Sequence, residues 1–105
     1  MIYAFLGYEL NTLRYALSHA GILLHIEPKT FDLLLHLIEH HEQVVTKEDL
    51  HTHLWPDQFV SDSALTYYIS AARKAVGDSG RSQRVIKTVY GRGYSFVAPL
   101  ETPSA

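Results

Sequence analysis

The stretch VIKTVYGRGYSFVAP, residues 85–99, decides the fold of this chain. β-Branched and aromatic residues, which favour strands, flank a Gly91–Arg92–Gly93 unit in which glycine permits the positive φ of a tight turn. We therefore predict a β-hairpin over residues 85–97 with Arg92 at its tip. A phosphate-binding glycine loop is disfavoured, because the third glycine and the following helix of such a loop are absent. An ordinary solvated turn with a solubilising charge is the alternative interpretation of the tip.

The 105-residue chain has an apolar fraction of 47% and no cysteine. This length and composition fit one domain with a modest core, and the lack of cysteine excludes a disulfide framework or a thiolate metal site. No apolar run approaches the length of a membrane span, and the opening MIYAFLGYEL lacks the basic flank and long apolar core of a signal peptide. We therefore predict a cytoplasmic domain that makes no membrane contact through this chain.

Charge is divided unevenly along the chain, although the formal net charge is only −2. Residues 1–60 carry three basic and eight acidic side chains, for −5, whereas residues 61–105 carry six basic and three acidic ones, for +3. Between Arg73 and Arg92, Asp78 is the single acidic residue. Such asymmetry is typical of a polyanion-binding face in the second half of a chain.

Upstream of the hairpin, β-favouring segments alternate with turn signals such as Gly7 and SHAG, and they predict a small antiparallel sheet. Pro28 suits a first helical position, and the apolar residues spaced i, i+3, i+4, i+7 from Phe31 predict a helix that ends near EHHEQ. The four strands are expected at residues 3–6, 8–10, 15–17 and 22–26.

Two more helices are predicted before Gly77. Thr46 and Asp49 resemble a capping box that opens a helix over residues 47–54. A third helix spans residues 62–76 and is closed by Gly77. Its buried face is expected to hold Leu65, Ile69, Ala72 and Val76, and its exposed face Ser63, Thr66, Tyr67, Ser70, Arg73 and Lys74.

The order of these elements predicts an α+β fold: a winged helix-turn-helix with an N-terminal antiparallel sheet, three helices and a C-terminal β-hairpin wing. A protruding third helix fits the major groove of DNA, and the hairpin tip can lay Arg92 along the adjacent minor groove or backbone. Within the hairpin, Tyr94 and Phe96 lie two residues apart and therefore share a face, which we expect to pack on the third helix.

Four segments occur in the order and spacing of a known family: IEPKTFDLLLHLIEH (26–40), VVTKEDLHTHLWP (44–56), VSDSALTYYISAARKAVGD (60–78) and RVIKTVYGRGYSFVA (84–98). Over nearly its whole length, the chain resembles the OmpR/PhoB-type winged-helix DNA-binding domain of bacterial transcription regulators. The resemblance implies a recognition helix at residues 62–76 and a wing built around TVYGRGY. It also implies a domain at residues 1–98, followed by a tail or the start of a linker at residues 99–105.

The resemblance further implies roles for individual residues in binding double-stranded DNA. Ser70 and Ala71 are uncharged where family members often carry arginine or lysine. Cations near the end of the recognition helix are placed for phosphate, whereas residues such as Thr66 and Tyr67 sit nearer the groove floor. The implied DNA-binding residues are Lys47 and Trp55 at backbone-contacting positions, Thr66, Tyr67, Tyr68, Ser70, Ala71, Arg73 and Lys74 on the recognition helix, and Thr88, Tyr90, Arg92 and Tyr94 on the wing.

Partners other than DNA follow from the same resemblance. The loop at residues 56–61 (PDQFVS) is implied as a contact surface for RNA polymerase, and a second copy of the chain as a neighbour on DNA. Many relatives carry a phosphoacceptor receiver domain, part of a phosphorelay, ahead of the winged helix, but Met1 opens directly onto the first strand here. If Met1 is the natural start, the chain resembles the subgroup in which the DNA-binding domain comes first.

Two other classes of function compete with this interpretation. A metal site or hydrolase could use some of the seven histidines, such as His36 and His40, but no HExxH motif is present. A GxSxG elbow, a catalytic cysteine and a P-loop are also absent from the sequence, so we predict neither an enzyme nor a cofactor. A winged helix retained as a protein-interaction module is the second alternative, favoured by the acidic first half and by the uncharged Ser70 and Ala71.

Overall fold

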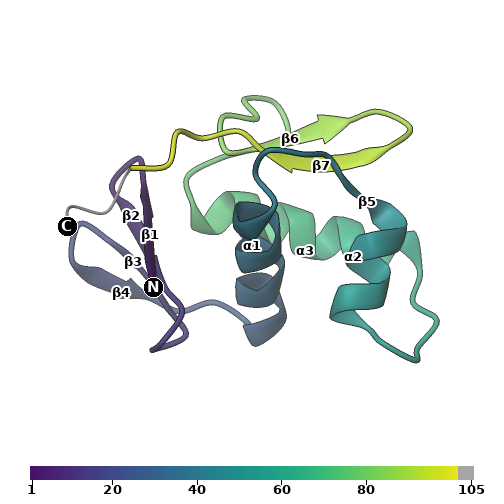
Figure 1. Ribbon diagram of the computed structural model, residues 1–105, viewed down its shortest axis with the longest axis horizontal. Coiled ribbons are helices and arrows are strands. Elements are labelled where there is room, and N and C mark those ends of the chain that lie inside the picture. Colours follow the sequence, from purple (N-terminus) through teal and green to yellow (C-terminus); the bar gives the residue numbers. More distant parts are fainter. Residues whose placement is uncertain (102–105) are drawn as a thin grey trace.

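The computed structural model describes residues 1–101 and confirms the predicted α+β winged-helix fold. Three helices form the centre, with one sheet at the end that holds the N-terminus and a second sheet lying across the helices (Figure 1). The elements are β1 (Ile2–Phe5), β2 (Tyr8–Asn11), β3 (Ala16–His19), β4 (Ile22–Leu24), α1 (Pro28–Glu39), β5 (Val45–Thr46), α2 (Lys47–Leu54), α3 (Asp62–Ala75), β6 (Ile86–Val89) and β7 (Gly93–Phe96).

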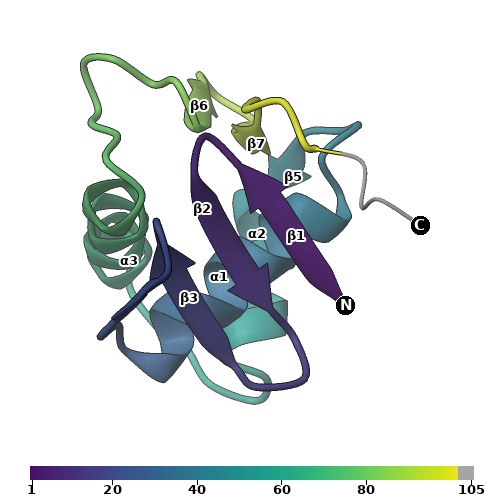
Figure 2. The same ribbon diagram turned by 90° about the vertical axis from the view of Figure 1, so that its left-hand side faces the viewer.

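The N-terminal sheet is antiparallel in the sequential order β1-β2-β3-β4. Gly7 adopts a φ of +84° in the turn between β1 and β2. Because side chains alternate across a strand, one face of the sheet presents the fully buried Phe5, Leu10 and Leu17 to the helices, and Figure 2 shows α1 behind this sheet. The four predicted strands are confirmed, but their bounds differ by one or two residues, because strand propensity does not mark where a turn begins.

The helices meet through the apolar faces that the sequence period predicts. On α3, the side chains of Leu65, Ile69, Ala72 and Val76 are at most 3% exposed, as expected. The helix itself ends at Ala75, one residue earlier than predicted, with Val76 as its C-cap. In the described part of the chain, none of the helices is long and apolar enough to cross a membrane.

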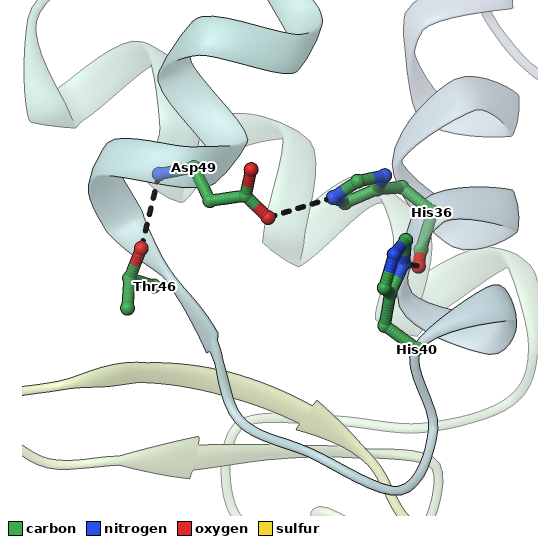
Figure 3. A network of polar contacts seen from close by, with 4 residues as sticks. All are labelled: His36, His40, Thr46 and Asp49. Atoms are coloured by element: carbon green, nitrogen blue, oxygen red, sulfur yellow. Dashed lines mark hydrogen bonds and ion pairs between the residues drawn. The ribbon is translucent and has the colours of Figure 1, made fainter.

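A polar network joins α1 to α2 (Figure 3). His36 Nε2 lies 2.9 Å from Asp49 Oδ2, and this hydrogen bond links the two helices. The Asp49 backbone N–H donates to Thr46 Oγ1 at 3.0 Å, which confirms Thr46 as the N-cap of α2. The His40 ring packs on the His36 ring, with 4.5 Å between centroids. Within residues 1–101, no three His, Cys, Asp or Glu side chains are arranged to hold a metal ion.

The wing belongs to a three-stranded sheet of order β5-β7-β6, not to an isolated hairpin. The sequence does not predict β5, because two residues are too few to show a strand period. Gly91 adopts the expected positive φ, +74°, whereas Gly93 does not. A Cβ on Gly93 would lie only 2.0 Å from the carbonyl oxygen of Val45, so glycine is required there by the close approach of β5.

The inner face of the wing carries Tyr94 and Phe96, which are 7% and 2% exposed and therefore buried as predicted. Among the helices, the main neighbour of β7 is α1 and not the expected α3. The Phe96 ring also packs edge-on against Phe5, with 5.1 Å between centroids. Beyond the wing, Leu100 packs on the core and the Glu101 N–H donates to the Ala4 carbonyl oxygen at 2.8 Å. The start of the predicted tail is thus tied to β1, and residues 102–105 lie outside the described residues.

Candidate nucleic-acid interface

The outer side of α3 presents a neutral and basic surface. Tyr67 is 55% exposed, and Thr66, Ser70 and Lys74 are exposed beside it, while Ala71 is half-buried at the edge of this surface. The Thr66 hydroxyl donates to the Asp62 carbonyl oxygen at 3.0 Å, so its lone pairs stay free to accept. Most of the predicted recognition-helix residues therefore lie together on one accessible face.

Arg73 is the exception, and its predicted exposure is wrong. The side chain is only 8% exposed. Its Nε and Nη2 donate to the Ile86 carbonyl oxygen at 3.2 and 3.0 Å, and Nη2 also donates to Thr88 Oγ1 at 2.8 Å. A helical period gives the direction in which a side chain leaves the helix but not where a long side chain ends, and this guanidinium reaches back to β6. Arg73 thus joins α3 to the wing, and Thr88 is half-buried in the same contact.

Asp78, the single acidic residue of the basic stretch, also organises this junction. Its Oδ2 accepts from the backbone N–H groups of Val85 and Ile86 at 3.0 and 2.9 Å, and its Oδ1 accepts from Arg84 N–H at 2.8 Å. Burial alone would raise the pKa of the Asp78 carboxyl, but these backbone hydrogen bonds outweigh it and hold the pKa far below its usual range. The carboxylate therefore fixes the path from α3 into β6 and neutralises no cation on the exposed face.

An aromatic cluster occupies the junction of α1, α2 and α3. Trp55, the C-cap of α2, is half-buried and packs on the Tyr68 ring with 5.8 Å between centroids. Lys29 Nζ lies 5.5 Å from the centroid of the Trp55 ring and donates to the Leu54 carbonyl oxygen. The structure thus brings Trp55 and Tyr68, both predicted site residues, together with Lys29, whose contact with Trp55 the sequence does not predict.

Glu27 joins this surface from the start of α1. The Tyr67 hydroxyl donates to Glu27 Oε1 at 2.6 Å, and the Tyr68 hydroxyl lies 3.5 Å from Oε2. The hydrogen bond to Glu27, together with the charge of that carboxylate, raises the pKa of Tyr67. No signal in the sequence predicts this contact, because 40 residues separate Glu27 from Tyr67.

The tip of the wing carries another exposed cation of the predicted site, Arg92. Tyr90 is 87% exposed and Arg92 is exposed next to it. Lys47, at the start of α2, lines a groove with Gly91, Arg92 and the acidic Glu48, so two predicted phosphate-contacting cations border the same groove. Tyr94 differs from these residues, because it is only 7% exposed and its ring packs in the core. Its predicted contact with DNA stays a prediction.

The loop between α2 and α3 forms a separate surface. Phe59 is fully exposed in this loop, and a hollow lined by Trp55, Pro56 and Phe59 runs beside it. An aromatic ring held entirely in solvent makes no contribution to the core, so the loop offers an apolar contact to another molecule.

Comparison with known proteins places this geometry in a family. The family described as "Transcriptional regulatory protein, C terminal" matches residues 21–96. The chain is 41% identical over 68 residues to the cholera toxin transcriptional activator of Vibrio cholerae, a match that covers 63% of this chain and 23% of the relative. The chain therefore spans about a quarter of the length of this curated relative.

Two solved structures share the fold. The response regulator DrrB of Thermotoga maritima, an OmpR/PhoB homologue, superposes with a TM-score of 0.83 at 33% identity, covering 91% of this chain and 44% of DrrB. The DNA-binding domain of RstA from Klebsiella pneumoniae, solved in complex with the RstA box, superposes with a TM-score of 0.81 at 24% identity, covering 91% of this chain and 96% of that one. The chain therefore belongs to the OmpR/PhoB-type family of C-terminal domains of bacterial transcriptional regulatory proteins, which are not enzymes.

Proposed function

We propose that this domain binds double-stranded DNA in a sequence-specific manner as the output domain of a bacterial transcriptional regulator, within the cytoplasm where bacterial DNA lies. Residues 1–98 form the binding domain, α3 enters the major groove, and the hairpin at residues 85–97 follows the minor groove or backbone. The observation that carries this proposal is the accessible face of α3, which holds hydroxyls, Tyr67 and Lys74 and no acidic side chain of its own after Asp62. The RstA domain, which shares the fold, is seen with DNA.

The residues divide into two roles in this proposal. Thr66, Tyr67 and Ser70 face base edges from α3, with Ala71 at the rim. Lys74, Lys47 and Arg92 neutralise phosphates, helped by Tyr90 at the tip and by Trp55 and Tyr68 beside α3. Arg73 acts indirectly, because it holds the wing in place against α3.

The loop at residues 56–61 supports a second contact, with RNA polymerase. Phe59 supplies the apolar anchor that a protein partner needs, and nothing in the described residues covers it. A second copy of the chain is a further neighbour when two half-sites adjoin on DNA.

The experiment that tests DNA binding is a selection of bound sequences from random duplexes, followed by titration of the enriched duplex at several salt concentrations. Three phosphate contacts predict that the logarithm of the binding constant falls with the logarithm of salt with a slope of about −3. Lys74→Ala should weaken binding to all duplexes equally and reduce the slope. Arg14→Ala is the matched control, because Arg14 is an exposed cation between β2 and β3, outside α3 and the wing. Failure to enrich any sequence would contradict the proposal and favour the protein-interaction module.

A further inference from the structure

Glu27 precedes the first turn of α1, but its side chain does not cap that helix. Its backbone angles, φ −64° and ψ 144°, are those of the N-cap of α1, yet its carboxylate makes no hydrogen bond to that helix. An acidic N-cap ordinarily accepts from an amide of its own first turn. Here the carboxylate instead accepts from the Tyr67 hydroxyl on α3.

This contact fixes an exposed ring. The Tyr67 and Tyr68 rings meet edge to face, with 4.9 Å between centroids and planes at 85°. The Tyr68 ring is packed in turn on Trp55. Tyr67 is therefore held at both its ring and its hydroxyl, although more than half of its surface is accessible to a ligand.

The contact also fixes which hydrogen bonds Tyr67 can offer. A phenol has one O–H to donate and lone pairs with which to accept. At 2.6 Å from a carboxylate oxygen, the O–H is committed to a short, charge-assisted hydrogen bond. The raised pKa of Tyr67 has the same cause, since both the hydrogen bond and the charge of Glu27 favour the protonated phenol. Only the lone pairs of the phenol oxygen are left to face solvent.

We propose that Glu27 is a specificity-determining residue that makes Tyr67 an obligate hydrogen-bond acceptor toward DNA. In the major groove, the donors that such an acceptor selects are the amino groups at adenine N6 and cytosine N4, whereas guanine O6 and thymine O4 are acceptors and are rejected. The exposed Glu27 carboxylate also repels the phosphates of DNA. Glu27 therefore improves the discrimination between bases but lowers the affinity of the domain for DNA. This inference rests on the proposed DNA binding of α3.

Competition binding tests the inference with four variants: Glu27→Gln, Tyr67→Phe, the double variant and Glu9→Gln. Glu9 is an exposed acid on β2, so Glu9→Gln removes the same charge away from α3. Glu27→Gln and Tyr67→Phe should each reduce, by about tenfold, the preference for an amino-bearing base over a keto base at one position of the selected site. The double variant should lose no more than either single variant, because both act on the same charge-assisted hydrogen bond: Glu27→Gln removes the negative charge and adds an amide donor, and Tyr67→Phe removes the hydroxyl.

The affinity for DNA should not fall together with the base preference. Glu27→Gln should bind unselected duplexes at least as tightly as the parent does, since a negative charge is gone, while Glu9→Gln should match the parent in preference. Unchanged preference in Glu27→Gln, or additive losses in the double variant, would overturn the assignment of Glu27.

A titration of the free protein separates this inference from the proposed function. NMR follows the Tyr67 phenol, and its signal is assigned as the one missing from Tyr67→Phe. The phenol should titrate at lower pH in Glu27→Gln than in the parent. In Glu9→Gln it should titrate at the same pH as in the parent. An unchanged titration in Glu27→Gln would overturn the contact, whatever the domain binds. If the titration shifts but the parent binds no duplex, the contact exists and the proposed function and base selection both fail.

Discussion

Arg73 and Arg92 carry the same charge on adjoining elements, yet the fold uses them in opposite ways. The Arg73 guanidinium is buried and donates to Ile86 and Thr88 at the base of the wing. The Arg92 side chain is exposed at the tip and makes no hydrogen bond within residues 1–101. The base of the wing is therefore an anchor, and the tip is a free cation. A count of basic residues does not separate these two uses.

The largest expected effect lies at the base, at Gly93. In Gly93→Ala, the new Cβ meets the Val45 carbonyl oxygen and the Thr46 Cα, both backbone atoms, so β5 and β7 must separate. We expect a loss of about 4 kcal/mol in the free energy of unfolding, measured by urea denaturation. Gly91→Ala is the matched control at the tip, because only its φ of +74° is strained and no atom lies within 4 Å of the new Cβ; it should cost about 1 kcal/mol. Equal losses in the two variants would remove the distinction between base and tip.

Asp78→Asn tests the base of the wing through the hydrogen bonds that the Asp78 carboxylate accepts there. The asparagine amide has one acceptor oxygen, so its NH₂ group faces backbone donors that Asp78 satisfies in the parent. We expect a loss of about 3 kcal/mol at pH 7. The exposed Asp57→Asn is the control and should be near neutral. A neutral Asp78→Asn would show that the carboxylate does not organise the junction.

The same carboxylate predicts how stability depends on pH. Because the pKa of Asp78 is lowered in the native state, its stabilisation is complete above the unfolded-state value of about 3.9 and is lost as the pH falls below it. The difference in unfolding free energy between the parent and Asp78→Asn should therefore narrow between about pH 5 and pH 2. A constant difference over this range would contradict the lowered pKa.

Arg73→Met keeps the length of the side chain but removes the donors to β6. The buried Ile86 carbonyl oxygen then loses its guanidinium partner, and we expect a loss of about 2 kcal/mol. DNA binding should also fall, because the wing is no longer held against α3. Lys74→Met, at the neighbouring exposed position, should leave the unfolding transition almost unchanged while weakening DNA binding.

The smallest effect on stability is expected for Arg92→Ala. The side chain is exposed at the tip, so the free energy of unfolding should change by less than about 0.5 kcal/mol. Binding to the selected duplex should nonetheless weaken. Parent-like binding would identify Arg92 as a solubilising turn residue, and unfolding of the variant would identify it as a second anchor.

The sequence by itself determines the order of the elements and the faces that they bury. Helical period is local, so the apolar stripes of α1 and α3 could be read directly, as could the Thr46 cap and the exposed tip at Arg92. The shared burial of Tyr94 and Phe96 follows from the strand period in the same way. Most of the candidate site on α3 was predictable, because each residue of a helix is rotated by a fixed angle about the helix axis and the buried face therefore defines the exposed one.

Only the tertiary structure decides what the long side chains and short strands do. The reach of Arg73 to β6, the pairing of β5 with β7 and the bond from Tyr67 to Glu27 each join residues that are distant along the chain. Local propensity carries no information about such contacts, since their free energy depends on how the packed elements approach one another. The two glycines of the wing show this limit in one turn: Gly91 is required by its own backbone angle, whereas Gly93 is required by a strand that lies almost 50 residues earlier.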